Sequence, residues 1–180
     1  MKMNLFKRFP NQKMKKKRDK RGQTKLSFGM IVAVILIIVF VSFAFYAISK
    51  FLGLQRTVEV SKFADDLQFD IDKLWKSQGS QEVNYRLPAR VEEVCFVDYS
   101  IPESGIDIEK YRMLKKAFYG DENLIFYPVG SGEGLDSKII AHIDLDLITE
   151  TNNPFCLKNN NGVKMTISRD FKDSLVTITE

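Results

Sequence analysis

The feature that most constrains this chain is an uncharged, apolar run of 24 residues, Leu26–Ser49. At about 1.5 Å per residue, an α-helix of this length reaches roughly 36 Å, and the hydrocarbon core of a bilayer is about 30 Å thick. A core helix of a soluble protein normally has a polar face, whereas this run has none. The sequence therefore predicts a single transmembrane helix over 26–49.

Charged residues are distributed very unevenly on the two sides of this run. Residues 1–25 contain 11 basic residues and one acidic residue, a net charge of +10. The remainder contains 16 of the 27 basic and 22 of the 23 acidic residues, a net charge of −6, so the overall charge of +4 conceals two opposite halves. Basic residues close to a span stay on the cytoplasmic side. We therefore expect a cell-membrane protein with a basic cytoplasmic tail or leader at 1–25 and an extracytoplasmic domain after Lys50.

The basic tail has a second interpretation. Its densest part, KMKKKRDKR at 13–21, could neutralise nucleic-acid phosphates, but no aromatic residue is interleaved with the charges. Beside a span, the more direct role is to fix the topology and to attract anionic lipid headgroups, at about 1 kcal/mol per basic residue near the surface. A lipid bilayer and its anionic headgroups are therefore the expected partners, and nucleic acid is not.

A cleavable secretory signal is also basic and then apolar. Its apolar region is usually about 7 to 15 residues long and ends in a small-residue cleavage site. Here the run is longer and continues into FYAISKFLGLQ, at 45–55, without such a site. We therefore expect no cleavage behind the span, and an anchor that persists.

The junction between tail and span reads KRGQTKLSF at 20–28. With a basic leader that ends in Arg21-Gly22, a following Gln23 and then an apolar helix, it resembles the class III signal peptides of archaeal type IV pilins and archaellins. The resemblance implies that a membrane peptidase cuts between Gly22 and Gln23 and that the apolar segment becomes the mature amino terminus. Such pilins usually carry a Glu at the fifth mature position, where this chain has Ser27.

The same residues have a simpler interpretation. Arg21 and Lys25 can be charges that flank an ordinary span, and Gly22 can separate the tail from the helix. Lys25 also stands at the third mature position, where the pilin family rarely has a basic residue. Both interpretations stay open, since a short motif without structural context matches many unrelated chains.

Beyond Lys50 the apolar positions recur mostly at spacings of three or four residues, which is helical periodicity. Polar residues fill the other face, and Gly79 supplies a stop signal. We therefore expect an amphipathic stalk helix over 50–78, followed by one extracytoplasmic domain over 79–180, because about 100 residues suffice for a small core. A membrane helix whose outer half packs on a sheet is also the architecture that the pilin resemblance implies. The apolar positions are Phe51, Leu54, Val58, Phe63, Leu67, Ile71, Leu74 and Trp75.

Six segments of the domain have the β-branched, partly alternating composition of strands. A helix is predicted over 107–119, which Asp107 can cap and Gly120 can end. The segment NNG at 160–162 has the residues of a hairpin turn, so we expect its flanking strands to be antiparallel neighbours. These elements predict an α+β fold with a mostly antiparallel sheet that the stalk helix covers on one face. The predicted strands are 83–87, 91–97, 124–129, 138–148, 163–169 and 174–179.

The two cysteines, Cys95 and Cys156, both lie in the part expected outside the cell. Two thiols in an oxidising compartment usually pair, and a bridge that closes a loop of about sixty residues contributes roughly 4 kcal/mol. Two buried free thiols or a metal pair are the alternatives. A zinc site would need two further ligands, and the chain has a single histidine and no CxxC motif.

The only histidine, His142, lies in AHIDLDL, where strand alternation places His142, Asp144 and Asp146 on one face. Such a row could bind a hard cation or form an acid/base pair, but calcium needs six to eight oxygen ligands, and we favour a solvated strand face. The run GSGEG at 130–134 lacks the Lys-Ser/Thr ending of a phosphate loop and predicts a flexible connection. No catalytic, cofactor or metal site is predicted, so the chain is not expected to be an enzyme.

Function is predicted mainly from the span. Gly29 and Ala33 stand four residues apart in it, a spacing of small residues that permits close contact between membrane helices. We therefore expect a structural or assembly subunit, pilin-like in design, whose span contacts further copies of the chain or other membrane helices. The alternative is a membrane-anchored binding or scaffold domain that uses an exposed sheet edge or its loops. A membrane-tethered enzyme is the least supported, since no site meets the chemical requirements.

Overall fold

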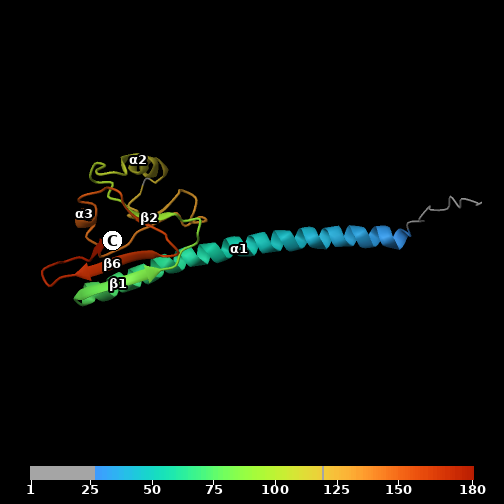
Figure 1. Ribbon diagram of the computed structural model, residues 1–180, viewed down its shortest axis with the longest axis horizontal. Coiled ribbons are helices and arrows are strands. Elements are labelled where there is room, and N and C mark those ends of the chain that lie inside the picture. The colour runs from blue at the N-terminus through green and yellow to red at the C-terminus, as the bar shows by residue number, and fades with distance from the viewer. Residues whose placement is uncertain (1–26, 119) are drawn as a thin grey trace, which may run out of the picture. The chain divides into compact units, whose positions relative to one another are not determined.

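The computed structural model describes residues 27–118 and 120–180 and has an α+β fold (Figure 1). Its longest element is α1, Phe28–Lys76, a helix of 49 residues. The chain divides into two compact units, and the boundary between them follows Ala44, inside this helix. The larger unit, Phe45–Glu180, contains every strand named below.

The first sheet of the larger unit is antiparallel and has three strands. They are β1 (Gly79–Tyr85), β6 (Val163–Arg169) and β7 (Thr177–Thr179), with β6 in the centre. The register places Val83 of β1 opposite Met165 of β6. In Figure 1, β1 and β6 lie alongside the C-terminal half of α1.

The second sheet is also antiparallel and has four strands, in the order β4-β3-β2-β5. Its strands are short, and its edge strand β5 pairs with β2. Two helices accompany the sheets, one of ten and one of four residues. The remaining elements are β2 (Glu93–Phe96), α2 (Ile108–Ala117), β3 (Leu124–Tyr127), β4 (Ser137–Lys138), α3 (Leu145–Ile148) and β5 (Phe155–Lys158).

One stripe of α1 forms the centre of the main hydrophobic core. Phe63 lies in the middle of this stripe, with its ring centroid 5.4 Å from that of Tyr85 in β1 and 5.6 Å from that of Phe126 in β3. Because β1 and β3 belong to different sheets, one face of the helix closes a common core against both. Each large apolar side chain buried there contributes about 1.5–3 kcal/mol. The buried residues of α1 are Val60, Phe63, Ala64, Leu67, Ile71 and Leu74.

The four-stranded sheet is buried on both of its faces. Successive side chains of a strand point to opposite faces. On β2, Val94 and Phe96 join the α1 core, whereas Cys95 joins a second cluster. This cluster includes Tyr111 and Leu114 of α2, which lies on the other side of β2 from α1 (Figure 1). Two-sided burial explains why 94–97 is apolar at consecutive positions rather than alternating.

An arginine from β6 satisfies the C-terminal end of α1. Arg169 Nη1 donates to the carbonyl oxygens of Trp75, at 2.6 Å, and Ser77, at 2.9 Å. The last carbonyls of a helix have no partner within the helix, so these bonds fix the point at which α1 stops. The chain then turns at Gly79, whose φ of +135° favours glycine.

The prediction of one long strand over 138–148 is wrong. Of these residues only Lys138 belongs to a strand, as the last residue of β4, and Leu145–Ile148 is the short helix α3. His142 has a φ of +65°, a left-handed conformation that interrupts an extended strand. The local alternation of apolar and polar residues was therefore misleading.

The predicted row of polar residues on one strand face is wrong for the same reason. Asp144 caps α3, since its Oδ1 accepts a hydrogen bond from the backbone N–H of Leu147 at 3.0 Å. Asp146 lies within α3, and His142 lies before the cap. The three side chains therefore do not share a strand face.

The NNG segment does form a turn, but the predicted hairpin is wrong. Asn161 and Gly162 have φ values of +61° and +140°, as such a turn requires. The flanking strands separate: β5 pairs with β2, and β6 pairs with β1. The expected single sheet is therefore two sheets that diverge at this turn.

The helix predicted over 107–119 is α2, Ile108–Ala117, and residue 119 lies outside the described residues. Asp107 precedes the helix without a capping hydrogen bond from its side chain. Its carboxylate lies 3.0 Å from Lys110 Nζ instead. An ion pair with the first turn thus replaces the expected cap.

The expected apolar face of the stalk helix begins later than the sequence pattern indicated. Phe51, Leu54 and Val58 are exposed, and Val60 is the first buried residue of α1. The three exposed residues keep the helical spacing but lie on the side of the helix opposite Val60 and Leu67, because each residue advances about 100° around the axis. Periodicity alone did not distinguish these two faces.

Candidate functional site

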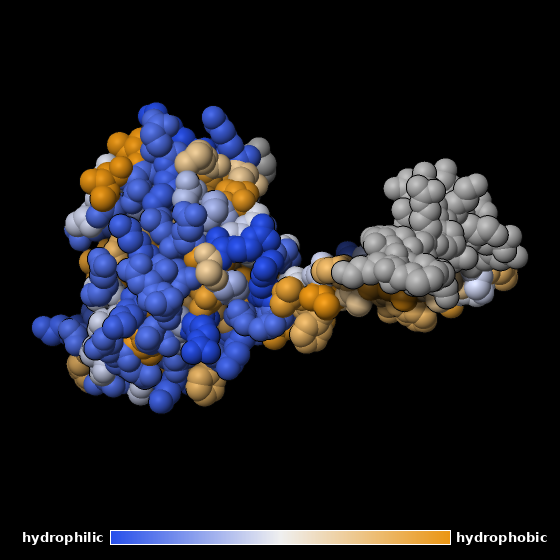
Figure 2. Space-filling model, turned by 45° about the vertical axis from the view of Figure 1, so that its right-hand side comes forward, coloured by the Kyte–Doolittle hydropathy of each residue, from blue (hydrophilic) through white to orange (hydrophobic). Residues whose placement is uncertain are grey.

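The N-terminal part of α1 has an apolar surface on all sides. Its large side chains from Phe28 to Leu54 are between 39% and 81% exposed. Figure 2 shows them in orange where the grey atoms do not cover them. Among the described residues, α1 is the one helix that is long and apolar enough to cross a membrane. This apolar segment is the first candidate functional surface.

Gly29 and Ala33 lie one turn apart on the apolar segment, and both are exposed. A Cβ atom added at Gly29 would meet only the side chain of Ser27, at 3.6 Å. The packing of the described chain therefore does not require glycine there, and contact with another helix stays a prediction. Gly22 and Gln23, the predicted processing site, lie outside the described residues.

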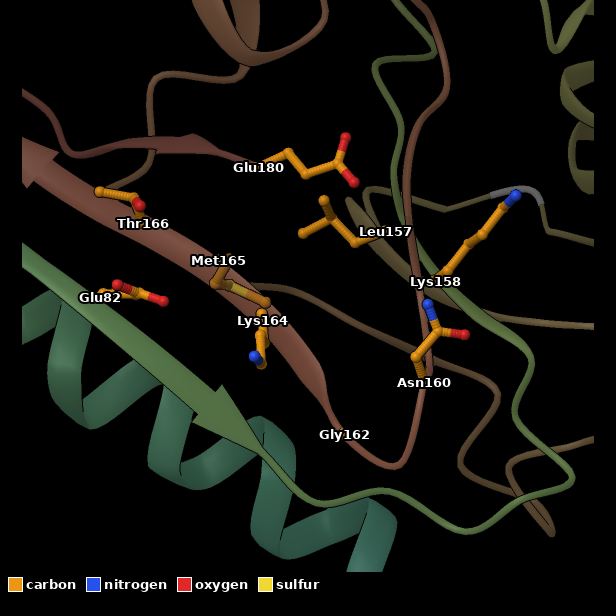
Figure 3. Close-up of a pocket in the computed structure, with 9 residues that line it drawn as sticks. All are labelled: Glu82, Leu157, Lys158, Asn160, Gly162, Lys164, Met165, Thr166 and Glu180. Atoms are coloured by element: carbon orange, nitrogen blue, oxygen red, sulfur yellow. The ribbon is translucent and has the colours of Figure 1, made fainter.

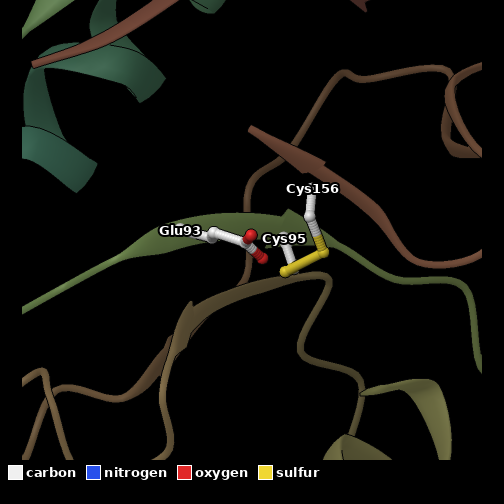
Figure 4. A group of neighbouring side chains, drawn as sticks. All are labelled: Glu93, Cys95 and Cys156. Atoms are coloured by element: carbon white, nitrogen blue, oxygen red, sulfur yellow. A yellow bond between two sulfur atoms is a disulfide. The ribbon is translucent and has the colours of Figure 1, made fainter. Parts of the chain in front are cut away.

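Cys95 and Cys156 are joined by a disulfide bond (Figure 4). They lie directly opposite each other on β2 and β5, and Cys95 is fully buried in the cluster beneath α2. The bond ties the edge strand of the four-stranded sheet to its neighbour. A disulfide is stable in an oxidising compartment.

Glu93 stands on the same face of β2 as this disulfide (Figure 4). A carboxylate oxygen and the two sulfur atoms lie within 4.8 Å of one another, but the sulfur atoms are bonded to each other and are not thiolate ligands. Glu93 forms an ion pair with Lys110 of α2 instead. Burial disfavours the charged form of Lys110, yet Glu93 and Asp107 together raise the pKa of this ammonium group. The cluster therefore fastens α2 to the sheet.

A groove with a cavity volume of about 590 Å³ opens where β5 and β6 diverge (Figure 3). Leu157 and Met165 supply apolar surface in it. The remaining lining is mostly polar and carries both signs of charge, unlike the largely apolar pockets that hold small ligands. Its charged residues are Glu82, Lys158, Lys164 and Glu180. The groove is the second candidate functional surface.

A cluster of side chains on α1 holds the loop that precedes α3. Gln68 Oε1 accepts a hydrogen bond from the backbone N–H of Ala141 at 2.8 Å, and Gln68 Nε2 lies 3.3 Å from the Ala141 carbonyl oxygen. The ring of His142 stacks on Trp75 with a centroid distance of 3.7 Å. His142 Nδ1 is 2.9 Å from Asp72 Oδ1. Trp75 is partly buried, packs against the main hydrophobic core and supports the histidine.

The Asp72 carboxylate is expected to make this cluster sensitive to acid. Its hydrogen bond with His142 lowers the pKa of Asp72, against the opposing effect of burial. A carboxyl group whose pKa is lower in the folded state stabilises the fold above about pH 4 and loses that contribution as the pH falls through the folded pKa. We expect Asp72→Asn to cost about 0.5 kcal/mol at pH 6, as for a partly exposed pair, and nothing near pH 2.

Denaturant titrations at the two pH values, followed by the fluorescence of the single tryptophan, would measure this difference. Asp65→Asn is the matched control, because among the described residues Asp65 accepts a hydrogen bond only within its own helix, from Ser61 at 3.4 Å. A cost of Asp72→Asn that is the same at both pH values would contradict the role of the carboxylate.

The glycine-rich run at 130–134 forms a turn that contacts α1 through a charged side chain. Glu133 has a φ of +53°, and its Oε1 lies 3.4 Å from Nη1 of Arg56 in α1. The same oxygen pairs with Nη1 of Arg90. No local sequence pattern indicates this cluster, because Arg56 and Arg90 precede Glu133 by 77 and 43 residues. Arg56 and Arg90, which share the Glu133 carboxylate, are called the arginine pair below.

Comparison of the chain with protein-family models, curated proteins and solved structures found no match. Its function is therefore argued from the described residues themselves. The apolar segment, the groove and the arginine pair are the features that the interior packing of the larger unit does not explain.

Proposed function

We propose that this chain is a single-pass protein of the cell membrane. The apolar segment of α1 crosses the bilayer once, the basic residues at 1–25 stay in the cytoplasm, and the domain after Lys50 lies outside. Within this topology the chain acts as a structural or assembly subunit rather than as an enzyme.

The observation that carries the proposal is the exposure of the apolar segment on all sides. From Val60 onward, α1 buries one face in the domain, but between Phe28 and Leu54 every large apolar side chain is open. Leaving a side chain of this size in water forgoes about 1.5–3 kcal/mol. Lipid is the surrounding that satisfies an apolar surface on every side of one helix, while the helix satisfies its own backbone.

The orientation rests on charge. The net charge of +10 before the span and −6 after it corresponds to the arrangement in which basic flanks remain in the cytoplasm. The disulfide between Cys95 and Cys156 is consistent with a domain in an oxidising compartment. These two arguments are independent of each other.

Two sequence features support the assembly role. One is the junction KRGQTKLSF, which resembles a pilin processing site, and the other is the spacing of Gly29 and Ala33, which would let neighbouring membrane helices approach closely. The span of such a subunit would be covered partly by lipid and partly by neighbouring spans. The resemblance to class III signal peptides further implies cleavage between Gly22 and Gln23.

Two measurements test the topology. Alkaline carbonate should leave the protein in the membrane pellet, and a protease added to intact cells should digest the domain while sparing a cytoplasmic control protein. Recovery in the soluble fraction without detergent would refute the span. A domain that is protected in intact cells but digested after lysis would refute the orientation.

A third measurement tests the assembly role. Mass spectrometry of the protein purified from its native membrane should find Gln23 as the first residue. An intact Met1 would count against processing and favour the anchored binding domain. The groove between β5 and β6 supports that second candidate, because its mixed charges and open form suit an extended chain.

A further inference from the structure

The arginine pair lies near the point where α1 leaves the apolar segment and first contacts the rest of the domain. Arg56 is seven residues beyond Ser49, which is about 10 Å along a helix axis. The polar headgroup layer on each side of a bilayer is about 5–8 Å thick. Lys50 Nζ lies 5.8 Å from the ring centroid of Tyr46, and both residue types are enriched at the membrane interface. On the proposed topology, the backbone of Arg56 therefore lies about 2–5 Å beyond the outer headgroup layer, and its long side chain brings the guanidinium group within reach of a headgroup.

The charges of the arginine pair are only partly compensated. Both guanidinium groups contact a single carboxylate oxygen, Glu133 Oε1, through their Nη1 atoms. Each guanidinium has five N–H donors, and within 27–118 and 120–180 no other hydrogen bond of either group is found. The cluster thus retains a charge of +1 and most of its donors. The side chains of Arg56 and Arg90 are 40% and 55% exposed.

The backbone of the turn adds a second observation. Glu133 adopts a left-handed φ of +53°, which favours glycine, although both of its neighbours are glycines. Non-glycine residues in this conformation often occur at functional positions. Here the glutamate brings together two arginines that come from different segments of the chain. Two converging guanidinium groups match the oxygen geometry of a phosphate.

We propose that Arg56 and Arg90 together bind the phosphate group of a phospholipid headgroup in the outer leaflet. The inference rests on the proposed membrane topology. Glu133 holds the two guanidinium groups near each other when no lipid is bound, and the phosphate takes up their remaining donors. Binding at this point would fix the height of the domain above the bilayer.

Chemical modification of arginine tests the site at single-residue resolution. The full chain is placed in bilayer discs of phosphatidylglycerol or of a phosphate-free galactolipid, treated with phenylglyoxal, and analysed by peptide mass spectrometry. Arg56 and Arg90 should each react about fivefold more slowly in the phospholipid, the effect expected for one basic residue at a charged surface. Arg112 is the internal control, because it is 54% exposed and pairs with two carboxylates, Glu103 and Glu109.

Equal rates for Arg56 and Arg90 in the two lipids would overturn the proposal. Inorganic phosphate is also added to the galactolipid discs. If it protected the two arginines as much as the phospholipid does, the site would bind free phosphate, and the proposal would be overturned. Glu133→Gln removes the competing carboxylate and should keep or increase the lipid protection. If this variant abolished the protection, the two guanidinium groups would not bind the lipid phosphate by themselves, and the lipid site would be refuted.

Carbonate extraction of the same samples separates the two levels of inference. A protein that resists extraction but shows equal arginine rates would refute the phosphate site and leave the span intact. A protein that is extracted would refute the span itself.

Discussion

Replacing Phe63 with alanine is expected to lower the free energy of unfolding of the larger unit by about 3–5 kcal/mol. The side chain is 1% exposed, and its ring meets Tyr85 and Phe126 edge-on in two different sheets. The truncation would therefore leave a cavity where α1 and both sheets meet. Because two separate sheets line this cavity, a shift of either one cannot fill it. Denaturant titration of the full chain in detergent, followed by Trp75 fluorescence, measures the loss.

Phe69 provides the matched control for this substitution. It lies on the same helix but is 69% exposed. Phe69→Ala should therefore change the free energy of unfolding by no more than about 0.5 kcal/mol, as for most surface substitutions. Similar costs at the two positions would mean that α1 does not pack on the sheets through the face described above.

Breaking the disulfide between Cys95 and Cys156 is expected to lower stability by about 4 kcal/mol, because the bond closes a loop with a sequence separation of 61 residues. The destabilisation should appear either on reduction or in the double variant Cys95→Ala/Cys156→Ala. The measurement is the shift of the denaturation midpoint between oxidised and reduced protein. Without this contribution, the free energy of unfolding of a domain of about 100 residues would be close to zero.

The double variant also supplies the control, since a reductant should not change its denaturation midpoint. Thiol titration of the unfolded, unreduced protein gives an independent check. Two free thiols in that titration, or an unchanged midpoint on reduction, would contradict the bond.

Features with a strong local pattern could be predicted from the sequence. The long apolar helix followed from the uncharged run, and the α+β class followed from the β-branched segments after Gly79. The disulfide followed from the number of cysteines and their expected compartment. In each case the signal is contained in neighbouring residues or in composition, so no knowledge of distant pairing was needed.

Features that depend on distant pairing could not be predicted. The NNG turn looked like a hairpin, but β5 leaves β6 to place Cys156 opposite Cys95, a partner far away in the sequence. Alternation around His142 looked like a strand, but the contacts of Gln68 and Asp72 from α1 hold this segment in a loop. In both cases long-range contacts overrode a local preference.

The candidate functional surfaces also differ in whether a local sequence pattern reveals them. The apolar segment was evident from sequence, because lipid exposure is a property of one helix. The arginine pair and its glutamate were not evident, because Arg56, Arg90 and Glu133 come from a helix, a loop and a glycine-rich turn that meet only in the folded chain. A charged residue between glycines, as in GSGEG, is the one local signal that could have drawn attention to them.

The position at which α1 first becomes buried has a practical consequence. Arg56 is the first described residue of this helix to pair with another element, and Val60 is the first with a buried side chain. A polypeptide that starts at Gln55 would thus retain all buried residues of the hydrophobic core and lack the exposed apolar segment. Such a fragment should be recoverable from aqueous buffer and suitable for crystallisation or for raising antibodies against the domain.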